Sequence, residues 1–379
     1  MAQSLPKYRY PRLDPSLRTI RLLRLLAASR YDDIRCELTH CYLDHPKQYE
    51  AISYCWGIKD GERQRTCPIT LDGQKFMVSP VVEDILGRLR RSRDDRLLWL
   101  DLVCIDQNSV ADRELQVSRM AEIFRCAQQV NVSLGPHEFT VDRGSASETI
   151  VRSAGQLAAT GVEPSAWFFN QSELEQLFDH PWFERVWVVQ EVAFARNIRV
   201  VAGSAEVSGV FAAQLLKVLD ESRPPQHVPR HLKPLLRLMT PPNKTYAQSD
   251  LLTVIQNFRS CKATLPADKV YALMQLCAPA WRLQVDYKIP TEQVFVNAVW
   301  SILKKTSSLE VLCSTDPRAH LGGNRLPSWV PDWTRQYQPD QHVPEQPQYL
   351  KRIPEPEDPR GARPGGLLDK LKAKLRSPI

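Results

Sequence analysis

One stretch decides how the chain is read: Pro181-Trp182-Phe183-Glu184-Arg185-Val186-Trp187-Val188-Val189-Gln190-Glu191. Trp187 and Glu191 are four residues apart, and on a helix such residues lie one above the other on the same face. A flat ring beside a carboxylate suits a nucleotide, because the ring stacks on a base and the carboxylate accepts hydrogen bonds from ribose hydroxyls. With nine Trp in the chain, such a pair arises by accident about half the time. Its meaning therefore depends on the sequence upstream.

Composition is that of an ordinary globular protein, with 43% apolar and 25% charged residues over a length of 379. That length suffices for about two domains. No run approaches the roughly 18 apolar residues of a membrane span, and arginines interrupt the apolar positions of the first 30 residues, so we expect no signal peptide. The net charge of +7 is mild and spread out, except in a basic tail that we expect to be solvated. We therefore expect a cytoplasmic protein without a specific nucleic-acid partner.

The nine cysteines are scattered and include no Cys-x-x-Cys pair, which argues against a disulfide framework or a zinc knuckle. One cluster, Cys36, His40, Cys41 and His45, offers four ligand types within ten residues. The segment reads as a strand followed by a loop, and adjacent residues of a strand point to opposite faces. The sequence therefore predicts no metal site.

Strand and helix patterns alternate through the first half, which predicts an α/β fold with a largely parallel sheet. Expected strands are Ile20 to Leu26, Ile34 to Thr39, Glu50 to Tyr54, a hairpin turning at Asp72-Gly73, Leu97 to Leu100, Val130 to Leu134 and Ile198 to Ala202. Expected helices begin after Ser79 and Ser109, lie near Glu148 to Ala159, include Trp187 and Glu191, and run from about Gly209 to Glu221. Further helical patterns are Leu251 to Phe258, Asp268 to Leu276 and Thr291 to Leu303.

These patterns divide the chain into four parts. Residues 1–48 supply leading strands, and 49–222 form the α/β domain with an insertion near 136–170. Proline-rich sequence then introduces a smaller, mainly helical lobe at 223–335. Residues 336–379, rich in proline and charge, are expected to be a disordered tail.

Ligands of open α/β sheets bind outside the carboxyl ends of the strands. One expected strand ends at Ser53-Tyr54-Cys55-Trp56-Gly57, and another ends at Asp101 and leads to Asp106-Gln107. Hydroxyl, aromatic, carboxylate and amide groups thus gather at one rim, which Trp187 and Glu191 could flank. Each residue also has a purely structural reading: Trp56 and Gly57 could close a turn, and Asp101 could cap one.

Other chemistries find less support. The chain has no Gly-rich phosphate loop of either common type and no Gly-x-Ser-x-Gly elbow. Cys104 lies in an apolar run, which predicts a buried, inert thiol rather than a nucleophile.

Three blocks in this order resemble the heterokaryon-incompatibility (HET) domain of filamentous fungi. They are Tyr49 to Gly57, Leu98 to Gln107 followed by Glu114, Gln116, Met120 and Ala127, and Trp182 to Ala193. Segments beyond them, Asp268 to Leu273, Val285 to Tyr287 and Leu326 to Trp333, resemble stretches that commonly follow this domain.

The resemblance implies a role in non-self recognition, with cell death when incompatible hyphae fuse, through self-association or another signalling protein. HET domains are remotely similar to Toll/interleukin-receptor (TIR) domains, which use a flavodoxin-like sheet. Some TIR domains cleave NAD with a glutamate four residues after a tryptophan, a pattern that Trp187 and Glu191 match. The resemblance implies no bound cofactor and makes NAD a candidate substrate. Glu191 would then be catalytic, Trp187 would pack on the dinucleotide, and Ser53, Tyr54 and Asp101 would line the mouth.

Three hypotheses remain open: a signalling domain that acts by assembly, an NAD-cleaving enzyme, and a non-catalytic scaffold. They predict different surroundings for the Glu191 side chain. Catalysis predicts that Glu191 is partly open to a cleft beside Tyr54 or Asp101, whereas a structural role predicts that it is sealed.

Overall fold

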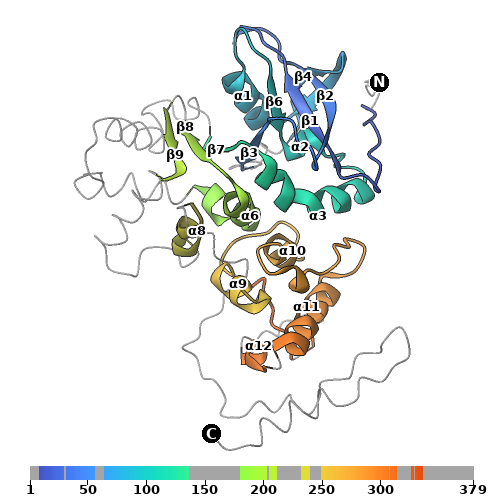
Figure 1. Cartoon of the computed structure of the whole chain (residues 1–379), viewed down its shortest axis with the longest axis vertical. Helices are drawn as coiled ribbons and strands as arrows, with labels where there is room; N and C mark the ends of the chain where they lie inside the picture. The colour runs from blue at the N-terminus through green and yellow to red at the C-terminus, as the bar shows by residue number, and fades with distance from the viewer. Residues whose placement is uncertain are drawn as a thin grey trace, which may run out of the picture. The chain divides into compact units, whose positions relative to one another are not determined.

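The computed structural model describes residues 8–29, 31–55, 64–135, 180–202, 205–210, 232–239, 249–306, 308–313, 326–327 and 329–335. The chain divides into two units, Met1–Lys244 and Thr245–Ile379 (Figure 1). The expected insertion at 136–170, the helix near Glu148 to Ala159 and the tail at 336–379 lie outside the described residues. Of the expected helix from Gly209 to Glu221, only the first two residues are described.

The first unit is built on nine strands. Their bounds are β1 (Thr19–Leu25), β2 (Arg35–Tyr42), β3 (Glu50–Tyr54), β4 (Cys67–Leu71), β5 (Gln74–Val78), β6 (Arg96–Trp99), β7 (Gln129–Ser133), β8 (Ile198–Ala202) and β9 (Ala205–Ser208). Their order in the sheet is β5-β4-β2-β1-β6-β3-β7-β8-β9. All the strands expected in the described part of the chain are present, and β9 is an addition.

The sheet is mixed, which corrects the prediction of a largely parallel one. Strands β6, β3, β7 and β8 run parallel to one another, and β2 and β4 are also parallel. Strand β1 is antiparallel to both of its neighbours, β2 and β6, and the β4–β5 and β8–β9 pairs are antiparallel hairpins. The short connections of the β1–β2, β4–β5 and β8–β9 pairs leave no room for the crossover that parallel neighbours require.

Among the parallel strands, the order along the sheet differs from the order along the chain. Strand β3 comes first in the sequence but lies between β6 and β7. After β3 the chain adds β6 on one side of it, and then crosses over to add β7 and β8 on the other side. Such a reversal opens a crevice at the carboxyl ends of the two strands that flank it, here β3 and β7.

The described helices of this unit are α1 (Pro80–Leu89), α2 (Asp101–Cys104), α3 (Val110–Cys126), the 3-10 turn η3 (Pro181–Glu184), α6 (Val186–Phe194) and α8 (Leu232–Met239). Helices α1 and α3 begin after Ser79 and Ser109, as the sequence signals predict, whereas α2, η3 and α8 were not expected. The Ser79 hydroxyl accepts from the amide of Val82, and the Ser109 hydroxyl accepts from that of Asp112, so both predicted caps are confirmed. Helices α3 and α6 pack against each other, and α8 packs against α6 (Figure 1).

The predicted hairpin turn is present, with positive φ angles of 49° at Asp72 and 74° at Gly73. The Asp72 carboxylate accepts hydrogen bonds from the Tyr8 hydroxyl and, at 3.0 Å, from the amide of Leu38. This turn therefore also anchors the β2 backbone and the segment before β1.

A buried polar ladder joins the central strands near their amino ends. Arg96 on β6 forms a two-pronged ion pair with Glu50 on β3, with Nε–Oε1 and Nη2–Oε2 distances of 3.0 and 2.5 Å. Asn131 on β7 donates to the same carboxylate at 2.8 Å. Burial alone would raise the pKa of Glu50, but the hydrogen bonds from Arg96 and Asn131 outweigh it and hold that pKa below its usual value. The carboxylate is therefore charged inside the sheet.

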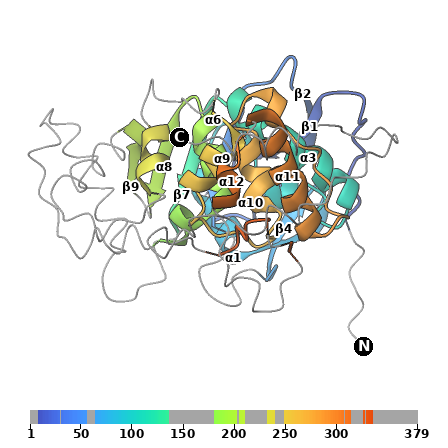
Figure 2. The same ribbon diagram turned by 90° about the horizontal axis from the view of Figure 1, so that it is seen from below.

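The described part of the second unit is mainly helical. It contains α9 (Leu251–Asn257), α10 (Asp268–Met274), the turn η4 (Pro279–Trp281), α11 (Thr291–Thr306) and α12 (Glu310–Cys313), and contacts run from α9 to α10 and α11 and from α11 to α12 (Figure 2). Residues 329–335 are fixed to these helices, because the Arg259 side chain donates to the carbonyls of Asp332 and Arg335 at 2.9 and 3.0 Å. None of the helices in the described segments combines the length and apolar character needed to cross a bilayer.

Candidate functional site

The carboxyl end of β3 and helix α6 meet through a chain of buried hydrogen bonds. The hydroxyl of Ser53 donates to Oε2 of Glu191. The indole Nε1 of Trp182, in η3, donates to Ser53 Oγ at 2.7 Å. All three side chains are buried, with exposed fractions of 1% for Ser53, 5% for Glu191 and 0% for Trp182. The two residues that the sequence places at opposite ends of the candidate site, Ser53 and Glu191, are thus in direct contact.

A second set of contacts surrounds Tyr54, the last residue of β3. Its hydroxyl donates to Asp101 Oδ1 at 3.1 Å, and Arg185 donates to its backbone carbonyl. Asp101 begins α2 and accepts from the amide of Leu102 at 2.7 Å, while Gln107 donates to the Asp101 carbonyl at 2.9 Å. The ends of β3 and β6 and the start of α6 therefore converge, as the strand-end rule predicts.

Electrostatics at this rim are unusual. Burial raises the pKa of Glu191 to about 7, although the charge of Arg185 and the hydrogen bond from Ser53 lower it, and the charge of Asp101 adds a further rise. Burial also raises the pKa of Tyr54 well above its ordinary value, assisted by Asp101. A carboxyl group that titrates near neutrality is suited to proton transfer or to a switch in charge.

The remaining predicted site residues lie as follows. Trp187, one turn before Glu191 on α6, is half-buried. Asp106 serves a local turn: its side chain accepts from the amide of Asn108 at 3.0 Å. Trp56 and Gly57 lie outside the described residues. Cys104 is fully buried and burial raises its thiol pKa to about 12, in agreement with the expected inert thiol.

Three residues of the site escaped the sequence prediction: His180, Trp182 and Arg185. His180 Nδ1 accepts from the backbone amide of Trp182 at 3.1 Å, which caps η3. Burial lowers the pKa of His180 to about 4, so its imidazole is neutral. Its Nε2 is buried and has no hydrogen-bond partner among the residues that the structure describes. Pro181 is the sequence signal for η3, because proline favours the first position of a helix. The spacing of Trp187 and Glu191 indicates only the next helix, α6.

Glu191 is closed off in this state, which does not meet the expectation of an open carboxylate beside Tyr54 or Asp101. Its neighbours on α6, Val188, Val189, Gln190 and Val192, are fully buried too. No set of three or more His, Cys, Asp or Glu side chains within the described segments is arranged to hold a metal ion.

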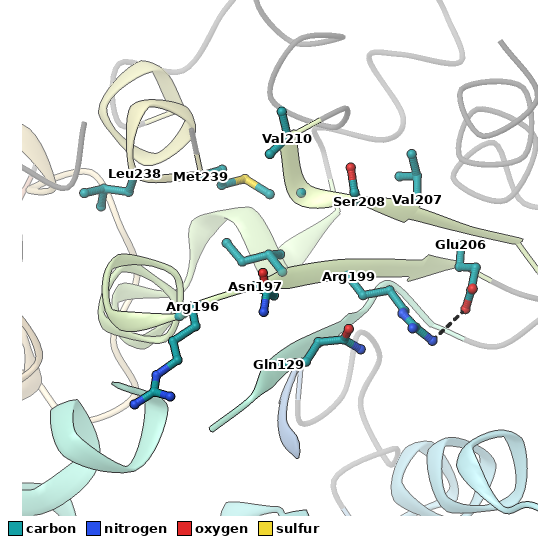
Figure 3. Close-up of a pocket in the computed structure, with 13 residues that line it drawn as sticks. Gln129, Arg196, Asn197, Arg199, Glu206, Val207, Ser208, Val210, Leu238 and Met239 are labelled. Atoms are coloured by element: carbon teal, nitrogen blue, oxygen red, sulfur yellow. Dashed lines mark hydrogen bonds and ion pairs between the residues drawn. The ribbon is translucent and has the colours of Figure 1, made fainter. Parts of the chain in front are cut away.

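A separate hollow of about 420 Å³ lies at the opposite, amino-terminal ends of β7 and β8 (Figure 3). Its walls include Leu238 and Met239 of α8 and the β8–β9 hairpin, in which Arg199 pairs with Glu206 at 3.2 Å. Gly209 lines it, and a Cβ there would lie 2.6 Å from Cβ of Ile198. This hollow contains none of the predicted site residues.

Comparison with known proteins agrees with the sequence blocks. Residues 49–191 match the family model described as heterokaryon incompatibility protein (HET). The chain is 26% identical over 403 residues to heterokaryon incompatibility protein 6, OR allele, of Neurospora crassa. That alignment covers 84% of this chain and 58% of the relative, so the chain spans less than two thirds of the relative's length. No solved structure matches the chain.

The matched stretch begins one residue before β3 and ends at Glu191. It therefore contains both members of the Ser53–Glu191 hydrogen bond, together with Trp182, Tyr54 and Asp101. On these grounds residues 49–191 are a heterokaryon-incompatibility (HET) domain, and the chain is a HET-domain protein.

Proposed function

We propose that this chain acts in fungal non-self recognition, where its HET domain signals cell death after incompatible hyphae fuse. Support comes from the family match and from the relative, whose name is that of a heterokaryon incompatibility protein. The observation that carries the proposal is the buried Trp182–Ser53–Glu191 chain, which joins the two ends of the matched stretch at the carboxyl edge of the sheet.

We further propose that the domain is TIR-like, with a flavodoxin-like arrangement of its parallel strands. Numbered by their order in the chain, β3, β6, β7 and β8 lie in the order 2-1-3-4. The flavodoxin-like order 2-1-3-4-5 begins in the same way. The antiparallel strands β1 and β2 are then an addition beside β6, on the side away from β3.

Signalling in this proposal proceeds by self-association. Strands β5 and β9 each have a strand neighbour on one side only within the described part of the sheet. Such strands carry unpaired backbone groups that can pair with another chain. A second copy of the protein, or another signalling protein, would provide the complementary edge.

Controlled expression in a filamentous fungus tests this function. We expect growth arrest with the wild-type chain and loss of arrest with Ser53→Ala, which breaks the chain of hydrogen bonds. Asp44→Asn, which changes an exposed carboxylate of the same unit away from the edge strands β5 and β9, is the control and should still cause arrest. If Ser53→Ala causes equally strong arrest at an equal protein level, the hydrogen bonds of this site are not required for the function.

A second candidate function is cleavage of NAD by Glu191. A titratable carboxyl group near the β3–β7 reversal favours it, because an anion there would stabilise an oxocarbenium-like centre as nicotinamide leaves. Burial of Glu191 counts against it in the closed state, so catalysis would require η3 and α6 to separate from β3.

Incubation of the purified full chain with NAD decides between these functions. Nicotinamide release by the wild type, lost in Glu191→Gln, would establish catalysis. No release at concentrations where the protein associates, together with growth arrest that persists in Glu191→Gln, would leave assembly alone. A chain that neither cleaves NAD nor causes arrest would be a scaffold.

A further inference from the structure

Trp182 contacts the candidate site through a group that can only donate a hydrogen bond. The indole Nε1–H has no lone pair to accept with, and it lies 2.7 Å from Ser53 Oγ. Because Trp182 offers no acceptor, the Ser53 proton cannot point back toward the indole. The partner that Ser53 has for that proton is Oε2 of Glu191.

We propose that Trp182 is a positioning residue, which fixes the hydrogen-bond direction from Trp182 through Ser53 to Glu191 and so stabilises the ionised carboxylate. A donor that binds Ser53 Oγ also polarises its O–H bond, and this strengthens the next hydrogen bond in the chain. Trp182 thereby acts on Glu191 without touching it. The inference rests on the proposed function only in taking Glu191 as the functional carboxyl group.

The surroundings hold the indole in place for this role. Trp182 is 0% exposed and packs edge-on against Phe183, with ring centroids 5.0 Å apart. His180 Nδ1 accepts from the Trp182 amide, which fixes the backbone of η3. Neither the ring nor the main chain can turn away without breaking these contacts.

Other charged groups act on Glu191 from known positions. Arg185, just before α6, favours the ionised carboxylate, while Asp101 at the start of α2 opposes it. Tyr54 on β3 is neutral, because its pKa is raised by burial. The side chains that α3 buries are uncharged, and so are the described buried side chains of α8. Burial outweighs the charge of Arg185 at Glu191, and the hydrogen bond from Ser53 acts with that charge against burial.

The test measures Glu191 itself, so it is independent of whether the protein cleaves NAD or kills cells. In the full chain labelled with ¹³C at glutamate Cδ, the Glu191 signal is identified by its loss in Glu191→Gln and is followed through a pH titration. Trp182 is replaced by benzothienylalanine, which keeps the ring shape but has sulfur in place of the N–H. Trp182→Phe is a second, simpler variant.

Trp99→Phe is the matched control. Trp99 is a buried tryptophan of β6 in the same unit, 1% exposed, and its Nε1 has no hydrogen-bond partner within the described part of the chain. It therefore reports the loss of ring volume without the loss of a hydrogen bond.

We expect the titration midpoint of Glu191 to rise by up to about one pH unit in both Trp182 variants and to stay in place in Trp99→Phe. Ser53→Ala should raise it at least as far, and Ser53→Thr, which keeps the hydroxyl, should restore it. An unchanged or lowered midpoint with benzothienylalanine would overturn the proposal. If Trp182→Phe fails to fold, the benzothienylalanine result alone decides.

Discussion

Trp182 lies between His180 and Glu191: its backbone amide donates to His180 Nδ1, and its indole Nε1 donates to Ser53, which in turn donates to Glu191. Both end groups are buried, and burial displaces their pKa values in opposite directions, down to about 4 for His180 and up to about 7 for Glu191. Both shifts favour the neutral form of the side chain. The effects of the two groups on stability against pH therefore have opposite signs.

Glu191→Gln should remove a loss of stability that occurs as the pH rises. The folded-state pKa of about 7 lies above the ordinary value of 4.5, so the folded protein holds a proton that the unfolded chain releases. The contribution of this group to the free energy of unfolding is fully present below pH 4.5. It decreases as the pH rises to 7, by on the order of 3 kcal/mol in total. Urea unfolding at several pH values should show the wild type losing stability relative to Glu191→Gln across this window. A constant difference between the two proteins would contradict the raised pKa.

His180→Asn should remove the opposite dependence. The folded-state pKa of about 4 lies below the ordinary 6.5, so stabilisation is full above pH 6.5 and is lost as the pH falls towards 4. Asparagine is a good N-cap and its Oδ1 can accept from the amide of Trp182 in place of Nδ1. Relative to this variant, the wild type should lose stability on acidification. In the wild type the two slopes offset each other where their pH ranges overlap, so each is read from the difference between the wild type and the variant that lacks that group.

Gly209→Ala should destabilise the fold, because its Cβ would lie 2.6 Å from Cβ of Ile198. Overpacking of this kind costs about 1–3 kcal/mol. Gly87→Ala is the matched control: it lies in α1 with nothing within 4 Å of the added Cβ, and alanine there should stabilise the helix by about 0.5–1 kcal/mol. Thermal unfolding of the two variants measures both effects. Equal midpoint temperatures for Gly209→Ala and Gly87→Ala would contradict the prediction, because they would show that β8 can move away from Gly209 without cost.

Arg96→Met should be strongly destabilising, because it leaves Glu50 charged and buried in the central sheet. Removal of one partner of a buried ion pair costs about 3–5 kcal/mol. The double variant Arg96→Met with Glu50→Gln should recover part of the loss. Arg18→Met breaks an ion pair with Asp44 whose side chains are 51% and 53% exposed, and should cost at most about 1 kcal/mol. Denaturant unfolding of all three would reveal a structural role for the ladder, and a small effect of Arg96→Met would argue against one.

Local patterns in the sequence predicted the elements but not all of their partners. Strands β3 and β8 have the predicted limits, because each is a short apolar run bounded by residues that break strands. The position of β1 between β2 and β6 could not be predicted, since it depends on pairing with Arg96 to Leu98, far along the chain. For this reason the mixed character of the sheet was missed.

The same limit applies to the site. Ser53, Tyr54 and Asp101 were predicted from the rule that ligands bind at the carboxyl ends of strands, and Glu191 was predicted from its spacing with Trp187; the structure brings their elements together. Trp182 was missed because its role depends on η3 being a separate turn that ends before α6 begins. Burial of Glu191 could not be predicted either, because it results from contacts between segments distant in the sequence.

The antiparallel pairing of β1 with β6 has a practical consequence for anyone who prepares this domain as a recombinant fragment. A fragment cut at residues 49–191 keeps β3, β6 and β7 but omits β1, the neighbour of β6, and β8, the neighbour of β7. It would leave the edges of β6 and β7 that face these neighbours without their backbone partners and should aggregate. A fragment from residue 8 to 244 keeps both neighbours, so the expression limits should follow the hydrogen bonds of the sheet rather than the limits of the family match.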